Sequence, residues 1–424
     1  MLIQNLSVRR QFEETGHATT KGHKIAVKGG YIHQTFQGGY TYSPLGFRVL
    51  LNIERIIRQE MNKIDGQEIL MPVVSGADLW IESGRYNTVD VLAKFKGRGG
   101  ADYVLNPTHE EIVVDYSRSF LESYRQMPFM LYQIQTKFRD ELRARAGVIR
   151  TREFIMKDGY SFHSDQADLE KYYARALDAY HKIFKRCGFQ NFVHVISPSG
   201  DMGGDIAHEF QLIHETGEDT IYLCDACGFN ANKELVGEDA TCPKCGAKMR
   251  QERAIEIGNI FQLGKKYSES MGLAYTDAAG KQNHPIMGCY GIGVTRILGA
   301  LLEESADDNG PVWNMETAPF AVHVIAISDK DGAAFTAAEK IYNDLTLAGV
   351  DAIFDGRDAR AGEKFADADL IAAPVRIIVS AKTLADKMAE VKYRVNDRDT
   401  SGMKDSFPLA DVVSETQKAI ELLK

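Results

Sequence analysis

The chain has 424 residues, of which 44% are hydrophobic and 26% are charged. These proportions are typical of a globular protein with two or three domains. The net charge of −9 excludes a chain coated in basic charge but leaves room for a local surface that binds a polyanion. No apolar run reaches the roughly 18 residues of a membrane span, and the N-terminus lacks the apolar core of a signal peptide. We therefore expect a cytoplasmic protein with no membrane partner.

The first strong helix pattern covers residues 43–64. Ser43 can cap this helix, and Pro44 suits its first turn. Apolar residues recur at helical spacing and predict its buried face: Leu45, Val49, Ile53, Ile56 and Ile57. A strand-like run, GQEILMPVV, follows at residues 66–74.

Residues 131–163 predict a strand, a basic loop and a second strand. The first strand alternates strictly, with polar side chains from Gln133 to Glu141 on one face. The loop contains four arginines: Arg143, Arg145, Arg150 and Arg152. Guanidinium groups bind phosphate bidentately, so this hairpin suits a triphosphate or a nucleic-acid backbone. A solvated loop on a half-exposed strand is the alternative.

A second helix is predicted over residues 165–188, where Gly188 ends it. Its predicted buried stripe is Leu169, Tyr173, Leu177, Tyr180 and Phe184.

Four of the six cysteines form two C-x-x-C pairs, each followed by glycine. Cys224 and Cys227 are separated from Cys242 and Cys245 by 14 residues. Four thiolates at this spacing suit a closed tetrahedral site. We predict a structural Zn²⁺ in a zinc-ribbon-like unit at residues 222–248. An unmetallated or redox-active set is the alternative.

The glycine-rich stretch at residues 287–300, MGCYGIGVTRILGA, resembles part of a dinucleotide-binding loop. That fingerprint needs a third glycine where this chain has Arg296, and it needs an early βαβ unit. A dinucleotide site is therefore disfavoured.

From residue 318 the pattern changes. Short β-rich runs alternate with helical stretches around residues 333–347, 364–372 and 408–423, which indicates an α/β domain over residues 318–424. In residues 1–317, strands adjoin one another without a helix between each pair, which indicates an α+β domain with a mostly antiparallel sheet.

These motifs resemble those of the class II aminoacyl-tRNA synthetases. The matching segments are about 44–74 (motif 1, with Pro72 as its proline), 131–163 (motif 2) and 287–304 (motif 3). Further segments resemble the bacterial-type prolyl-tRNA synthetases: NPTHEE at 106–111, HEFQ at 208–211 and GNIFQLGKKYSES at 258–270. Residues 354–379 resemble the anticodon-binding domain of that family. The resemblance implies an antiparallel-sheet catalytic domain over 1–317 and an anticodon-binding domain over 318–424.

The resemblance also implies the roles of individual residues. L-proline would be bound by Thr108, Glu110, Arg139, His208 and Cys289, with the Glu110 carboxylate taking the imino group. ATP, complexed with Mg²⁺, would be bound by Arg139, Glu141, Arg150, Thr151, Phe154, Gln211 and Arg296. The catalytic residues would be Arg139, Glu141 and Arg296, with Arg139 bridging the proline carboxylate and the α-phosphate. His109, His163 and Glu111 would either support the site or lie on the surface.

The implied activity is the ATP-dependent joining of proline to tRNA(Pro) through prolyl-adenylate, by a homodimer. The interval after HEFQ holds only the four-cysteine unit, so we predict no cis editing domain. Misactivated alanine is then cleared by a separate trans-editing protein or tolerated. Arg357 and Lys364 are candidates for anticodon contacts. Two alternatives stay open: a class II ligase for another amino acid, and a synthetase-like paralogue that does not act on tRNA.

Overall fold

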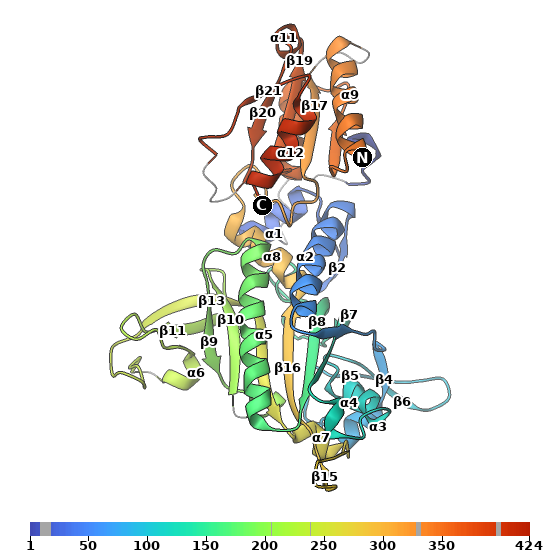
Figure 1. The fold of residues 1–424 in the computed structure, drawn as a ribbon, viewed down its shortest axis with the longest axis vertical. Helices are drawn as coiled ribbons and strands as arrows, with labels where there is room; N and C mark the ends of the chain where they lie inside the picture. Colours follow the sequence, from blue (N-terminus) through green and yellow to red (C-terminus); the bar gives the residue numbers. More distant parts are fainter. Residues whose placement is uncertain (9–17, 205, 238, 328–331, 396–399) are drawn as a thin grey trace. The chain divides into compact units, whose positions relative to one another are not determined.

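The computed structural model describes residues 1–8, 18–204, 206–237, 239–327, 332–395 and 400–424 (Figure 1). Contacts divide the chain into two compact units. The larger unit contains residues 36–39 and 54–300, and the smaller unit contains residues 1–35, 40–53 and 301–424. No helix in the described part of the chain is both long and apolar enough to cross a bilayer.

The larger unit is built on a nine-stranded sheet of order β10-β9-β12-β11-β13-β16-β8-β7-β3, in which β10 also pairs with β13. The strands are β3 Gly66–Glu68, β7 Phe129–Phe138, β8 Glu153–His163, β9 Phe192–Ser197, β10 Ile206–Ile213, β11 Asp219–Leu223, β12 Asn230–Asn232, β13 Arg250–Gly264 and β16 Ile286–Gly293. Only the pairs β3–β7 and β9–β12 are parallel. The predicted mostly antiparallel sheet is confirmed.

One long helix, α5 (Gln166–Cys187), packs along a face of this sheet against β8, β13 and β16 (Figure 1). Gly188, at φ 114°, ends the helix as predicted. Four of the five predicted stripe residues are buried, but Leu177 is only half-buried. Ala176, 1% exposed, takes its place, because a stripe on a long helix must advance by about 3.6 residues per turn.

The first predicted helix is α2, Pro44–Asn62. All five residues of its predicted buried face are 0% exposed, and the Ser43 hydroxyl accepts from the Gly46 N–H at 3.3 Å. The strand predicted at 66–74 is shorter than expected, since β3 ends at Glu68 and β4 (Val74–Gly76) is a separate strand. Pro72 lies between them and has no N–H for a ladder.

The other elements of the larger unit surround the central sheet. A three-stranded sheet has the order β4-β6-β5, with β5 Ala93–Lys96 and β6 Asp102–Leu105. The remaining elements are α3 Ala77–Glu82, α4 Glu110–Arg118, η2 Tyr124–Gln126, η3 Gly200–Met202, α6 Lys233–Val236, α7 Lys266–Ser270, β14 Tyr275–Thr276 and β15 Gln282–Asn283. Helix α8, Val294–Ser305, follows β16 directly.

The smaller unit contains a five-stranded sheet of order β18-β17-β19-β20-β21. Its strands are β17 Val322–Ile327, β18 Ala352–Asp355, β19 Val375–Ser380, β20 Met388–Tyr393 and β21 Ser406–Pro408, and its helices are α9 Ala333–Leu347, α10 Ala361–Ile371, α11 Ala381–Ala385 and α12 Val412–Leu422. The N-terminal elements are η1 Ile3–Asn5, α1 Lys21–Lys28, β1 Ile32–Phe36 and β2 Gly39–Tyr42. The predicted α/β alternation is confirmed, with β17 parallel to both β18 and β19.

Candidate active site

Two polar residues of β7 are buried rather than solvated. Gln133 and Lys137 are both 0% exposed, and both contact Asp158 of β8. Lys137 Nζ lies 2.8 Å from Asp158 Oδ1, and Gln133 Nε2 donates to Oδ2 at 3.1 Å. Burial favours a raised pKa for Asp158, but Lys137 and His109 hold that pKa below its ordinary value. The alternative of a half-exposed strand is therefore wrong at Gln133 and Lys137, which belong to a paired ionic network in the protein interior. The loop itself is partly solvated, since Arg143 and Arg145 are exposed.

A cavity of about 260 Å³, here called the first cavity, borders this network. Four of the residues predicted to bind proline line it: Thr108, Glu110, Arg139 and Cys289. Within the described residues, the Thr108 hydroxyl is buried and has no hydrogen-bond partner. A buried, unpaired hydroxyl costs about 1–3 kcal/mol, so it indicates a position that a polar ligand atom completes.

Glu110 begins α4 and is 2% exposed. Burial raises the pKa of Glu110 to about 7, although Arg85 pulls that pKa down. Arg85 Nη1 lies 3.5 Å from Glu110 Oε2 and 3.0 Å from Glu111 Oε1. Glu111 is 0% exposed, so it supports the site and does not lie on the surface.

A second cavity, of about 250 Å³, is lined by the predicted ATP contacts Glu141, Arg150 and Thr151. Arg150 Nη2 donates to Glu141 Oε2 at 3.0 Å, and its Nη1 donates to Glu218 Oε2 at 2.7 Å. Glu218 also pairs with Arg145. Two of the four loop arginines, Arg145 and Arg150, thus already have carboxylate partners, whereas Arg152 donates to backbone carbonyls.

The two cavities share Arg139, Phe154, Glu256 and Arg296. The Arg139 guanidinium lies 5.2 Å from the centre of the Phe154 ring. Burial and the neighbouring Arg296 both lower the pKa of Arg139. Two guanidinium groups at one place repel each other, so the junction of the cavities favours an anion.

The glycine-rich strand β16 forms part of the wall of the first cavity. A Cβ at Gly291 would lie 2.8 Å from Asn259 Oδ1, so a side chain here would require the Asn259 amide to move. Arg296 follows in the first turn of α8, where its Nη1 donates to Glu256 Oε2 at 3.0 Å. Strand β16 pairs antiparallel with both neighbours, which excludes the parallel βαβ unit of a dinucleotide fold.

His208 and Gln211, both on β10, line neither cavity. His208 turns toward α5, where its Nδ1 shares a hydrogen bond of 2.8 Å with the Tyr173 hydroxyl. Burial lowers the pKa of His208 to about 4. Gln211 Nε2 donates at 2.9 Å to Asp219 Oδ2, and Asp219 lines the second cavity. Gln211 thus lies one contact behind that cavity, and the predicted proline contact of His208 stays a prediction.

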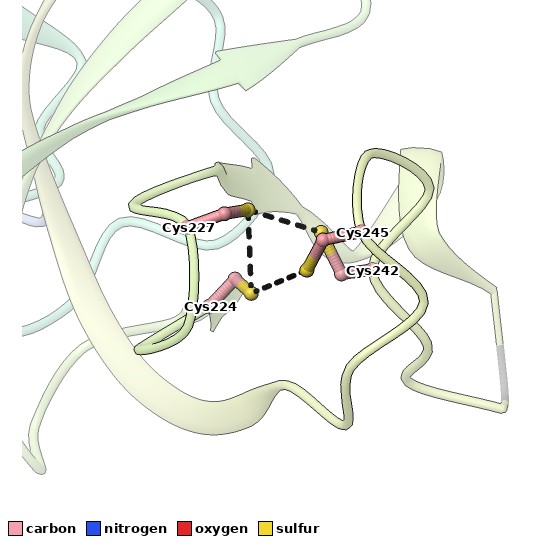
Figure 2. A group of neighbouring side chains, drawn as sticks. All are labelled: Cys224, Cys227, Cys242 and Cys245. Carbon is pink, nitrogen blue, oxygen red and sulfur yellow. Dashed lines mark hydrogen bonds between the residues drawn. The ribbon is translucent and has the colours of Figure 1, made fainter.

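The four predicted metal ligands come together in the turns that follow β11 and precede β13 (Figure 2). Their sulfur atoms all lie within 4.8 Å of one another. Cys224 Sγ is 3.5 Å from Cys245 and 3.6 Å from Cys227, and Cys227 is 3.6 Å from Cys242. Zn–S bonds of about 2.3 Å place tetrahedral ligands roughly 3.8 Å apart, so this donor set fits Zn²⁺.

Three charged residues that line the first cavity were missed by the sequence analysis: Arg85, Asp158 and Glu256. Arg85 follows α3 in a segment with no charge pattern, so nothing local marks it. Asp158 did carry a usable signal, because Lys157 and Asp158 directly follow the apolar run Phe154–Met156 within one strand. Charged residues in such a position are buried, and buried charges need partners.

Comparisons with known proteins agree with this geometry. Residues 94–305 match the family model "tRNA synthetase class II core domain (G, H, P, S and T)", and residues 321–419 match the model "Anticodon binding domain". A proline–tRNA ligase of Endomicrobium trichonymphae is 35% identical, over 89% of this chain and 92% of the relative. A proline–tRNA ligase of Heliobacterium modesticaldum is 33% identical, over 96% of both chains.

Two further observations concern the length and fold of these relatives. The alignment with the Endomicrobium protein has 527 positions, more than the 424 residues of this chain, so that relative has internal residues without a counterpart here. The crystal structure of a prolyl-tRNA synthetase from Cryptosporidium parvum complexed with L-proline and AMP shares the fold. Its TM-score is 0.75 at 20% identity, over 95% of this chain and 75% of that chain.

Proposed function

This chain belongs to the proline–tRNA ligase family of class II synthetases, and on that premise we propose how its residues carry out the reaction. First, the carboxylate of proline attacks the α-phosphorus of ATP, which gives prolyl-adenylate and pyrophosphate. Then the terminal 3′-hydroxyl of tRNA attacks the acyl carbon and expels AMP. The observation that carries the assignment of residues is the pair of cavities that meet at Arg139 and Arg296.

Proline occupies the first cavity. The Glu110 carboxylate binds the secondary ammonium, and the unpaired Thr108 hydroxyl takes the remaining polar contact. Cys289 is 5% exposed and forms part of the wall. Burial raises the pKa of the Cys289 thiol well above its ordinary value, so the thiol stays neutral and acts as a small apolar surface.

ATP occupies the second cavity. Arg139 binds the proline carboxylate and the α-phosphate. Arg150 and Arg296 bind the outer phosphates, which take the place of the carboxylates that pair with these two arginines in the free protein. Phe154 stacks on adenine, and Glu141 and Thr151 complete the wall. Mg²⁺ arrives with ATP as part of the substrate. The carboxylates of Asp219 and Glu256 line this cavity and suit such a cation.

Gln211 keeps a role in the nucleotide site by holding Asp219 in place. We do not extend the proposal to His208, because that side chain faces α5.

Neither step needs a protein nucleophile. The first step needs in-line placement of the proline carboxylate, the α-phosphorus and the leaving pyrophosphate, and neutralisation of charge on phosphate. Arg139, Glu141 and Arg296 are the proposed catalytic residues. Arg139 stabilises the charge that develops on the oxygens of the α-phosphate, and Arg296 neutralises the outer phosphates that leave as pyrophosphate.

The acceptor is tRNA(Pro), read by residues 318–424 and charged by residues 1–317. The match of residues 321–419 to an anticodon-binding model supports this division. For Arg357 and Lys364 an anticodon contact stays a prediction. Arg357 pairs with Asp355 and Asp367, and Lys364 Nζ donates to a backbone carbonyl.

We also propose a cytoplasmic homodimer. Leu70 and Val74 of the predicted motif 1 are 76% and 38% exposed, which suits a contact with a second copy. In the described residues between β10 and β13, the chain holds only β11, β12, α6 and the cysteine turns. With no editing domain there, alanine attached to tRNA is either removed by a separate protein or tolerated.

For the cysteine unit we propose Zn²⁺, which would supply a structural cross-link between the two turns. Cys224, Cys227, Cys242 and Cys245 would hold it, and a small cluster that includes Tyr222 and Met249 packs beside them.

The test is ATP–pyrophosphate exchange with proline, alanine and cysteine, each offered alone. We expect strong exchange with proline and weak exchange with the other two. Equal exchange with another amino acid would favour a different ligase, and no exchange with any of them would favour the paralogue.

A further inference from the structure

Arg85 is fixed in the wall of the first cavity by contacts on several sides. It is 5% exposed, and its guanidinium lies 5.1 Å from the Trp80 ring and 5.4 Å from the Tyr267 ring. Its Nη1 donates to both oxygens of Glu111, at 3.0 and 3.3 Å, but reaches Glu110 only at 3.5 Å. The cation is therefore bound mainly by Glu111.

The charges of these three side chains leave one negative charge at the cavity. Arg85 and Glu110 line the cavity, whereas Glu111 is fully buried behind them. If Arg85 paired fully with Glu110, nothing would remain to bind a substrate ammonium. If Arg85 were absent, two adjacent buried carboxylates would share a proton. The observed arrangement avoids both outcomes.

We propose that Arg85 keeps Glu110 anionic while Glu111, by binding Arg85, keeps Glu110 available, which makes both of them positioning residues for recognition of the substrate's secondary ammonium. This inference rests on the proposed role of Glu110. Selectivity for a cationic amine then comes from three charged side chains: Glu111 binds the Arg85 guanidinium, and Glu110 faces the ligand.

Other groups around Glu110 also affect its pKa. The titratable or charged groups that interact with it are Arg85, Glu111, Asp158, Lys137, Arg139, Tyr160, Tyr267 and Cys289. Burial raises the pKa of Glu110 to about 7, so its charge at neutral pH depends on small changes nearby. Arg85 lowers this pKa and Glu111 raises it, so removing either residue alone shifts it in opposite directions.

The test measures kcat/KM for proline by pyrophosphate exchange, from about pH 6 to about pH 9, with the KM for ATP as a second readout. In Arg85→Gln we expect kcat/KM for proline near neutral pH to fall about 100-fold, and its rising limb to move to higher pH. The KM for ATP should change by less than about twofold. Arg85→Lys keeps the charge and should keep the pH profile, although its weaker geometry reduces the rate.

The double variant Arg85→Gln/Glu111→Gln separates a charge effect from a packing effect. Removal of both charges leaves Glu110 as the single carboxylate, so we expect it to recover about tenfold over Arg85→Gln, with a limb that moves back toward lower pH. A uniform loss at every pH, with no recovery in the double variant, would show that Arg85 only packs and would overturn the proposal.

Glu111→Gln keeps the proposal testable if Arg85→Gln does not fold. Arg85 would then turn to Glu110, so kcat/KM for proline should fall about tenfold while the rising limb moves to lower pH. A limb that stays in place would overturn the proposal. If the wild-type protein exchanges normally while a variant gives one of these contrary results, the proposed roles of Arg85 and Glu111 are wrong but the proposed activity is not.

Discussion

The two cavities that meet at Arg139 balance their charges in opposite ways. In the first cavity, Glu110 is buried and only loosely paired, and the Thr108 hydroxyl has no partner among the described residues. In the second cavity, Arg150 is 40% exposed and already pairs with Glu141 and Glu218. A ligand completes the first cavity, whereas a ligand must displace existing ion pairs in the second.

This difference predicts where selectivity lies. An uncompensated buried charge interacts strongly because little water screens it, so the first cavity should discriminate sharply between ligands. Exposed pairs are worth about 0–1 kcal/mol each, so the second cavity should tolerate substitution better. Each of the following measurements compares proline parameters with ATP parameters.

The largest effect is expected at Arg139, the residue that serves both cavities. Arg139→Gln should reduce pyrophosphate exchange about 1,000-fold, because the variant loses a preorganised donor at the reacting phosphate. Arg143→Gln is the matched control, since Arg143 is exposed on the same loop and lines neither cavity. Equal losses in both variants would contradict the central position of Arg139.

Glu110→Gln should affect proline alone. We expect kcat/KM for proline to fall about 100-fold or more, because the substrate ammonium loses its buried counter-charge, and the KM for ATP to stay nearly constant. Glu269→Gln, at an exposed position, is the control. An equal rise in both KM values would mean that Glu110 supports the fold and does not bind proline.

The pH dependence should also divide the two substrates. Binding of the ammonium needs ionised Glu110, whose pKa is raised by burial to about 7. Protonation therefore removes the binding charge as the pH falls through this value, and kcat/KM for proline should rise about tenfold between about pH 6 and pH 8. A flat profile for proline would argue against Glu110 as the charged contact.

Arg150→Ala tests whether the second cavity tolerates substitution. Because Arg150 is partly exposed and must leave two carboxylates to reach phosphate, we expect the KM for ATP to rise only about fivefold to tenfold. The KM for proline should not move. A loss as large as that of Arg139→Gln would mean that the two cavities do not differ in the way described.

The smallest effect on activity is expected from the cysteine unit, which lines neither cavity. Cys242→Ser should abolish bound zinc, measured by metal analysis of the purified protein, and should lower the unfolding temperature by several degrees. Exchange with proline should stay within about twofold. Full retention of zinc, or its absence from the wild-type protein, would contradict the metal assignment.

Local pattern was enough to predict much of this molecule. The buried face of α2 and the glycine end of α5 follow from the 3.6-residue period and from cap chemistry. The four cysteines likewise met as their spacing predicted, because each pair lies within one tight turn. In the two helices the deciding partners are a few residues apart, and in the cysteine unit the two pairs are joined across a short connection, so the chain itself carries the information.

Other features depend on strands and turns that are distant in the chain. Arg85 and Glu111 are 26 residues apart, and nothing near either residue marks the pair. The alternating pattern of β7 by itself also fits a solvated polar face, and burial of Lys137 depends on Asp158, which β8 places beside it. The direction of His208 depends on which face of β10 is covered by α5.

The sequence by itself therefore determined the main helices and the family resemblance, and most of the site residues that it predicted line one of the two cavities. Only the tertiary structure decided how charges are shared among Glu110, Glu111 and Arg85. The energy of a buried charge depends on every group within a few ångströms, and long-range packing decides which groups those are.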